Sequence, residues 1–164
     1  MRNIRLTIEY DGSRYHGWQR LGAGEDTSST ISGKLSEVIF RMTGQKSELF
    51  CASRTETGVH AYAQTVNFHT GCSLSAREIR HYLNRYLPSD IAVLEVEDMP
   101  ERFHASLNAK KRTYIYRIST AEVPDVSNGS MYIICLRNRI LRRCVKHPDF
   151  WLDATIFSTS LPLK

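Results

Sequence analysis

The chain has 164 residues, of which 41% are hydrophobic, enough to form a packed core and to exclude a fully disordered protein. Its formal net charge of +5 favours an anionic partner, with nucleic acid as the first candidate. A basic protein with no nucleic-acid partner would have the same composition, so charge alone leaves both open.

The four cysteines, Cys51, Cys72, Cys135 and Cys144, contain no C-x-x-C pair, and the sequence therefore predicts no metal site of the zinc type. Charged residues recur through the first twenty positions, unlike a signal peptide. No apolar run is long enough to cross a membrane. We therefore expect a cytoplasmic protein with free thiols.

The first half of the chain alternates predicted strands with helices. Apolar residues alternate with polar ones over residues 4–10, which predicts a strand with one buried face. Apolar positions at helical spacing predict a helix over residues 31–42, and Gly44 follows as a stop. Strands are predicted over 48–53 and 63–69, on either side of the motif "SRTETGVHA".

A second helix has signals at both ends. Ser75 and Glu78 have the spacing of a capping box, and Leu74 can pack on Ile79 across the first turn. Pro88 is expected to end the helix.

A mostly apolar strand over residues 91–96 is expected at the centre of the sheet. The resulting order, β-α-β-β-α-β, predicts an α+β fold with a ferredoxin-like half and an antiparallel sheet, an arrangement common among RNA-binding domains. A further strand is predicted over 112–119.

Glu56 is the candidate reactive group in "SRTETGVHA". Gly58 permits a tight turn and a close backbone approach. Arg54 could pair with the carboxylate or with a phosphate, and a carboxylate near a cation stays ionised, as a nucleophile or base requires. The alternative is a surface salt bridge beside a turn, and the spacing alone favours this alternative.

Tyr114 lies among basic residues in "KKRTYIYR", residues 110–117. Basic and stacking groups together suit an unstacked base and its phosphates. A core tyrosine on an ordinary strand is the alternative.

Four motifs together resemble the TruA-type tRNA pseudouridine synthases. They are "YDGSRYHGWQR" at 10–20, "SRTETGVHA" at 53–61, "LNRYLPSDIAV" at 83–93 and "FHASLNAKKRTYIYRI" at 103–118. The resemblance implies an enzyme that isomerises uridine to pseudouridine in the tRNA anticodon arm. It also implies that there is no cofactor, that two chains form a homodimer, and that each chain has two α/β halves around a basic cleft.

The resemblance also assigns the site. It puts Glu56 at the position of the catalytic aspartate, Arg54 at that of the neighbouring arginine and Tyr114 at that of the active-site tyrosine. In the family the carboxylate attacks the nucleoside, the glycosidic bond breaks, and the base reattaches through carbon. The target base must leave its stack first, for which a cation and an aromatic ring are suited.

The chain departs from the family motifs at two positions. Glu56 is one methylene longer than the family's aspartate, and Ser106 stands where the family usually has arginine after F-H-A. A nucleophile displaced by about 1 Å can lose on the order of a hundredfold in rate. We therefore expect impaired activity. A non-catalytic RNA-binding remnant and a decayed product without a stable role are the competing hypotheses.

The sequence predicts three regions: an N-terminal half over 1–102, the start of a second half over 103–130, and a divergent basic tail over 131–164. Codons for "FWLDATIF" at 150–157, read two bases later, can encode L-V-G-R-H-D-F, which resembles a motif of the family's second half. This reading predicts that the C-terminal part is truncated or frameshifted.

Overall fold

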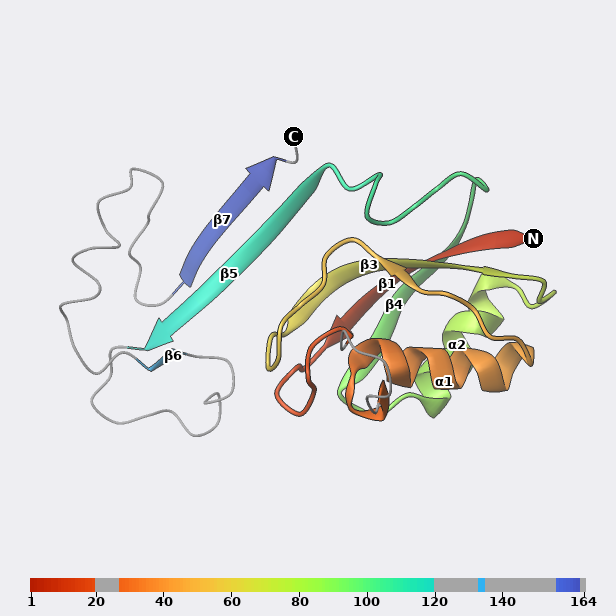
Figure 1. Ribbon diagram of the computed structural model, residues 1–164, viewed down its shortest axis with the longest axis horizontal. Helices are drawn as coiled ribbons and strands as arrows, with labels where there is room; N and C mark the ends of the chain where they lie inside the picture. The colour runs from red at the N-terminus through yellow and green to blue at the C-terminus, as the bar shows by residue number, and fades with distance from the viewer. Residues whose placement is uncertain (20–26, 120–132, 135–155, 163–164) are drawn as a thin grey trace. The chain divides into compact units, whose positions relative to one another are not determined.

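The computed structural model describes residues 1–19, 27–119, 133–134 and 156–162. The chain divides into two compact units, Met1–Ala109 and Lys110–Lys164, coloured from red to blue along the chain in Figure 1.

The first unit is a four-stranded antiparallel sheet with two helices on one face (Figure 1). Its sheet has the strand order β2-β3-β1-β4. The elements along the chain are β1 (Arg2–Tyr10), the 3-10 turn η1 (Thr27–Ser29), α1 (Ile31–Thr43), β2 (Phe50–Cys51), β3 (Ala61–Thr70), α2 (Ala76–Tyr86) and β4 (Ile91–Met99). The predicted α+β class and the β-α-β-β-α-β order are confirmed.

One face of the sheet and the inner faces of both helices form the core. Alternate residues of β1 and β3 face the helices, and leucine and isoleucine residues of α1 and α2 meet them there. Trp18 is fully buried in the same core. The fully buried apolar residues are Ile4, Leu6, Ile8, Trp18, Ile31, Leu35, Val66, Phe68, Ile79 and Leu83.

The helices begin and end at the predicted residues. The Ser75 hydroxyl accepts a hydrogen bond from the Glu78 amide, and the Glu78 side chain returns to the Ser75 amide, forming the capping box at the start of α2. Gly44 closes α1 with a φ of 70°, which a glycine adopts at little cost. Leu87 closes α2 directly before Pro88.

The predicted central position of residues 91–96 is wrong, because among the described strands β4 lies at the edge of the sheet and pairs with β1 alone. Ile91 and Val93 are buried under the helices, whereas Leu94 is 42% exposed. An edge strand covered on one face by helices therefore has the same apolar composition as a central one. The strand predicted over 48–53 is also shorter, reduced to Phe50–Cys51 in β2.

The opposite face of the sheet is partly covered by the segment after β4, through two buried asparagines. The Asn67 side chain donates to Asn3 Oδ1 at 3.0 Å and accepts from the Ala105 amide at 2.8 Å. The Asn3 side chain donates to the carbonyl of Phe103 at 2.8 Å. The His104 ring packs against Phe50 of β2 in a tilted arrangement, with ring centroids 4.6 Å apart. These contacts fix the FHAS segment on the sheet.

The second unit contains β5 (Lys111–Ser119), β6 (Ile133–Ile134) and β7 (Ile156–Pro162), in the order β6-β5-β7. β5 pairs antiparallel with β7 and parallel with β6. The strand predicted over 112–119 is β5. Most of the predicted tail over 131–164 lies outside the described residues, and the three-region division of the chain stays a prediction.

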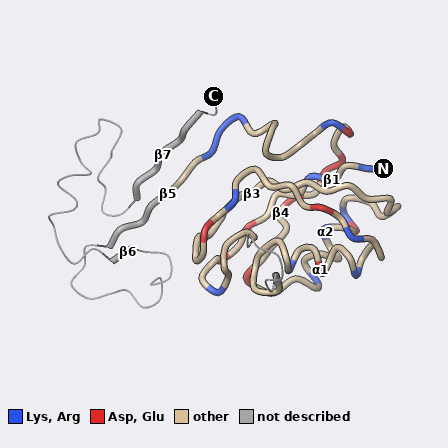
Figure 2. Tube along the Cα trace, in the orientation of Figure 1, with Lys and Arg blue, Asp and Glu red and all other residues tan. Residues whose placement is uncertain are grey.

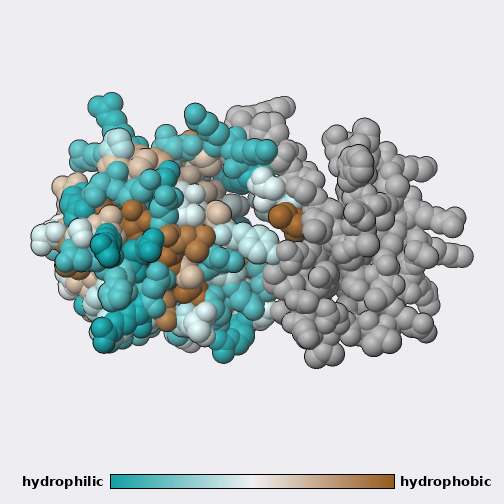
Figure 3. Space-filling view, turned by 180° about the vertical axis from the view of Figure 1, so that it is seen from behind, coloured by the Kyte–Doolittle hydropathy of each residue, from teal (hydrophilic) through white to brown (hydrophobic). Residues whose placement is uncertain are grey.

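Hydrophilic residues cover most of the described surface in Figure 3, with smaller apolar areas between them. Phe40 and Leu107 are among the large apolar side chains that remain exposed. Across the described ranges, no helix has the length and apolar character needed to span a bilayer.

We expect Asn67→Ala to lower the free energy of unfolding by about 2–3 kcal/mol, because the buried Ala105 amide and the side-chain oxygen of Asn3 would lose their hydrogen bonds to Asn67. Asn84→Ala is the matched control. The exposed Asn84 makes two hydrogen bonds to the Val93 backbone, which water can replace, so its loss should be about 1 kcal/mol or less. Urea unfolding measures both, and equal losses would contradict the structural role of Asn67.

Candidate active site

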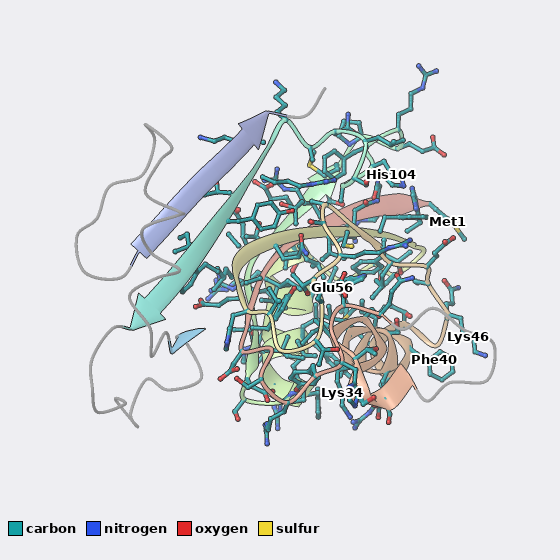
Figure 4. The ribbon with its side chains drawn as sticks, turned by 60° about the vertical axis from the view of Figure 1, so that its left-hand side comes forward. Met1, Lys34, Phe40, Lys46, Glu56 and His104 are labelled. Carbon is teal, nitrogen blue, oxygen red and sulfur yellow. The ribbon has the colours of Figure 1, made fainter. Side chains whose placement is uncertain are left out.

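Glu56 lies on the loop between β2 and β3, with its side chain exposed. Figure 4 labels it on this loop, and labels Lys34, Phe40 and Lys46 on and just after α1. The loop is short, so the position of Glu56 depends on what holds the backbone on either side of it.

Backbone hydrogen bonds hold the loop on both sides of Glu56. The Trp18 amide donates to the Thr55 carbonyl at 2.9 Å, and the Gly58 amide donates to the Tyr15 carbonyl at 3.2 Å. Within the loop, the Val59 amide donates to the Glu56 carbonyl at 3.2 Å and closes a turn. The segment after β1 therefore holds the residue before Glu56 and the turn after it.

Side chains from β1 and β3 fix the start of the loop. The Tyr10 hydroxyl lies 2.8 Å from Thr55 Oγ1, within hydrogen-bond range. The Gln64 amide contacts both backbone polar groups of Ser53, accepting from the amide and donating to the carbonyl. Burial raises the pKa of Tyr10, against the opposing effect of its hydrogen bonds to Thr55 and Gln64. Tyr10 therefore keeps its proton at neutral pH.

Two glycines allow the close approach between these segments. A Cβ on Gly17 would lie 2.5 Å from the Thr55 carbonyl oxygen, and Gly17 has a φ of +79°, which other residues rarely adopt. A Cβ on Gly12 would overlap the Val59 carbonyl. The motifs "YDGSRYHGWQR" and "SRTETGVHA" are therefore parts of one packed unit.

A contact between His60 and Asp11 holds the far end of the loop. His60 Nδ1 lies 3.1 Å from Asp11 Oδ1, and Asp11 also accepts a hydrogen bond from the Ser13 amide at 2.9 Å. The hydrogen bonds from Ser13, aided by His60 and Arg14, hold the pKa of Asp11 below its usual value. Asp11 is therefore ionised at neutral pH.

Arg54 and Glu56 are both exposed on the same loop. In the described part of the chain they form no ion pair with each other, so the surface salt bridge considered from the spacing is not observed. The Glu56 carboxylate and the Arg54 guanidinium both face solvent.

Tyr114 belongs to the second unit, where it lies on β5 and is 38% exposed. It is therefore not a buried core tyrosine. Figure 2 marks the basic residues at the start of β5, Lys110, Lys111 and Arg112, which precede it in the sequence.

Sequence reasoning did not single out the residues that position the loop, Tyr10, Gln64, Gly12 and Gly17. The glycines in "YDG" and "HGW" were the available signal, because a glycine has no Cβ and can mark a close backbone approach. Among the described residues, no group of three or more His, Cys, Asp or Glu side chains could hold a metal ion.

Comparison with known proteins shows which family this chain resembles in sequence. Residues 6–108 match the profile of a family described as tRNA pseudouridine synthase, a region that contains Arg54 and Glu56 and ends before Tyr114. A "tRNA pseudouridine synthase A 2" of Bacillus anthracis is 40% identical over 163 residues, which are 98% of this chain and 65% of the relative. A "tRNA pseudouridine synthase A" of Bacillus sp. strain KSM-64 is 49% identical over 118 residues, 72% of this chain and 47% of the relative.

A third relative, from Thermoanaerobacter sp. strain X514, is 41% identical over 135 residues, 81% of this chain and 54% of the relative. The chain thus spans less than two-thirds of the length of these curated relatives. The match includes the loop of Glu56 and the segment that holds it. The chain belongs to the tRNA pseudouridine synthase family.

Proposed function

We propose that this chain binds tRNA and isomerises uridine to pseudouridine in the anticodon arm, with Glu56 as the nucleophile. One observation carries the proposal: the Glu56 carboxylate faces solvent from a loop whose backbone is fixed on both sides. A nucleophile needs both features, because the substrate must reach it and its position must be set before the substrate arrives.

The proposed reaction needs no net oxidation or reduction. A Glu56 oxygen bonds to the nucleoside as the glycosidic bond to nitrogen breaks and the base leaves with the electron pair. The base turns, its carbon C5 bonds to the sugar, and the carboxylate departs. A proton moves from that carbon to the freed nitrogen, so that the product is an isomer of the substrate and no cofactor is consumed.

Arg54 and Tyr114 have substrate-binding roles in this proposal. The exposed Arg54 guanidinium can hold a phosphate next to the reacting nucleoside. The exposed ring of Tyr114 can stack on a base that has left its helix. We further propose that the chain acts in the cytoplasm, as its sequence leads us to expect, and as a homodimer, as its family resemblance implies.

The excess of basic residues supports an RNA partner, and this excess lies in the second unit. Residues 110–164 contain ten Lys and Arg against four Asp and Glu. Residues 1–109 contain twelve Lys and Arg against thirteen Asp and Glu. We therefore attribute most of the non-specific attraction for phosphates to residues after Ala109.

A non-catalytic RNA-binding protein is the second candidate. It is favoured by two positions, Glu56 in place of aspartate and Ser106 in place of arginine. The first displaces the nucleophile and the second removes a cation. Neither affects the basic residues at 110–112, so RNA binding would persist without turnover.

We expect Glu56→Asp to raise the rate of pseudouridine formation on unmodified tRNA by on the order of a hundredfold over the unaltered chain. The fixed loop backbone leaves the longer side chain about 1.5 Å beyond a site suited to aspartate. Glu56→Ala should give no product above background. The measurement is the pseudouridine content of the tRNA after incubation with each variant.

The three variants distinguish the two candidate functions. Equal background signal from all three, with tRNA binding retained, would support the RNA-binding alternative and reject Glu56 as a nucleophile. Fast turnover by the unaltered chain that Glu56→Ala abolishes would keep Glu56 as the nucleophile and reject the argument from side-chain length.

We expect tRNA affinity to fall steeply as salt rises, because binding releases counterions from the phosphates. Replacing the exposed Lys110 and Lys111 by glutamine should reduce the slope of log K against log salt by about 1.5, for two lost phosphate contacts. The matched control replaces Lys34 and Lys46 of the first unit by glutamine and should leave the slope nearly unchanged. A slope that responds equally to both pairs would contradict the assignment of RNA binding to the second unit.

A further inference from the structure

Asp90 lies in the "LPSD" motif directly before β4, far in the sequence from the Glu56 loop. Its carboxylate accepts a hydrogen bond from the Tyr15 hydroxyl at 2.6 Å. The Arg14 guanidinium donates to the second oxygen, from Nε at 3.0 Å. The Asp90 side chain is only 12% exposed. Nothing in the proposed chemistry uses this sheltered carboxylate directly.

Tyr15 connects Asp90 to the Glu56 loop. Tyr15 is 6% exposed, and its hydroxyl donates to Asp90, while its backbone carbonyl accepts a hydrogen bond from the Gly58 amide at 3.2 Å. The Tyr15 amide also donates to the Gly12 carbonyl at 2.9 Å, and the Asp11 amide donates to the Asp90 carbonyl at 2.9 Å. Tyr15 is therefore held at its side chain and at both backbone groups.

We propose that Asp90 is a positioning residue for Glu56, and that it acts through Tyr15 on the turn at Gly58. The inference rests on the proposed role of Glu56 as nucleophile. It assigns a task to the "LPSD" motif, which contributes no reacting group. Asp90 fixes the Tyr15 ring, the ring fixes its own carbonyl, and the carbonyl fixes the turn that follows Glu56.

The electrostatics suit this task. Burial raises the pKa of Asp90, but the hydrogen bonds from Tyr15 and Arg14 outweigh it and hold the pKa below its usual value. Burial, with the hydrogen bond to Asp90, raises the pKa of Tyr15 above its usual value. A protonated phenol thus donates to an ionised carboxylate at neutral pH, which makes a strong hydrogen bond.

We expect the hydrogen bond from Tyr15, rather than the contact with Arg14, to carry the positioning role of Asp90. The Arg14 side chain is 73% exposed, and an ion pair that faces solvent contributes little. The hydrogen bond between the Tyr15 hydroxyl and Asp90 is largely sheltered from solvent, so its loss should cost more than loss of the exposed contact between Arg14 and Asp90. A purely structural role for Asp90, in the turn before β4, would instead affect the stability of the unit without affecting Gly58 in particular.

The test uses two substitutions in the full chain that remove the charge-assisted hydrogen bond with little change in shape. Tyr15→Phe deletes only the hydroxyl, and Asp90→Asn keeps the side-chain shape but removes the charge. Tyr86→Phe is the matched control, because it deletes the same group from an exposed tyrosine on α2. Amide hydrogen exchange, measured by NMR, reports on Gly58 directly and on the Leu6 amide of β1 as a core reference.

We expect exchange at Gly58 to become about tenfold faster or more in Tyr15→Phe and Asp90→Asn, relative to Leu6, as expected for the loss of one charge-assisted hydrogen bond. Tyr86→Phe should leave that ratio unchanged. An unchanged ratio in both test variants, or equal acceleration at Gly58 and Leu6, would overturn the positioning role. This readout needs no turnover, so it stands even if Glu56 proves not to be a nucleophile.

A kinetic measurement tests whether the Tyr15–Asp90 hydrogen bond affects the proposed reaction. In the Glu56→Asp background, Tyr15→Phe and Asp90→Asn should lower kcat by about tenfold and leave KM for tRNA unchanged, because they misplace the nucleophile without removing an RNA contact. A rise in KM at constant kcat would overturn the positioning role and point to RNA binding by this segment.

Discussion

The site depends on the contact between the backbone of Gly17 and Trp18 and that of the Glu56 loop. The Trp18 amide bonds to the Thr55 carbonyl, and Gly17 leaves no room for a side chain there. The same two residues also receive the first turn of α1, since the amides of Ile31 and Ser32 donate to their carbonyls. Trp18 itself is fully buried. The loop is thereby connected to the helix start and to the core, and it cannot shift without disturbing both.

This constraint is the reason why the proposed role of Glu56 should be sensitive to the length of its side chain. On a mobile loop, the backbone could retreat to compensate for the additional methylene of Glu56. Here hydrogen bonds to Trp18 and Tyr15 fix the backbone on both sides, so the additional length is transmitted to the carboxylate. A rigid loop therefore makes the family's choice between aspartate and glutamate a geometric one, although the two acids are chemically equivalent.

Local signals in the sequence predicted the elements of the first unit, because helix ends and strand alternation depend on neighbouring residues. The capping box at Ser75, the stop at Gly44 and the break at Pro88 all appear in the structure. The edge position of β4 was missed, since burial by helices on one face gives an apolar strand wherever it lies in the sheet. The hydrogen bond from the Tyr15 hydroxyl to Asp90 joins residues far apart in the sequence, and no local pattern encodes such a contact.

The distribution of charge separates the proposed RNA binding from the proposed chemistry. The unit that carries Glu56 has one more acidic than basic residue, so it offers RNA no net attraction. The basic excess lies after Ala109, in residues that contribute no nucleophile. Phosphate attraction extends over about 8 Å at physiological salt, so basic residues need not touch the reacting nucleoside to recruit its RNA. In the proposed reaction, Arg54 is the local cation, because it is on the Glu56 loop itself, where we expect a phosphate beside the target nucleoside to lie within its reach.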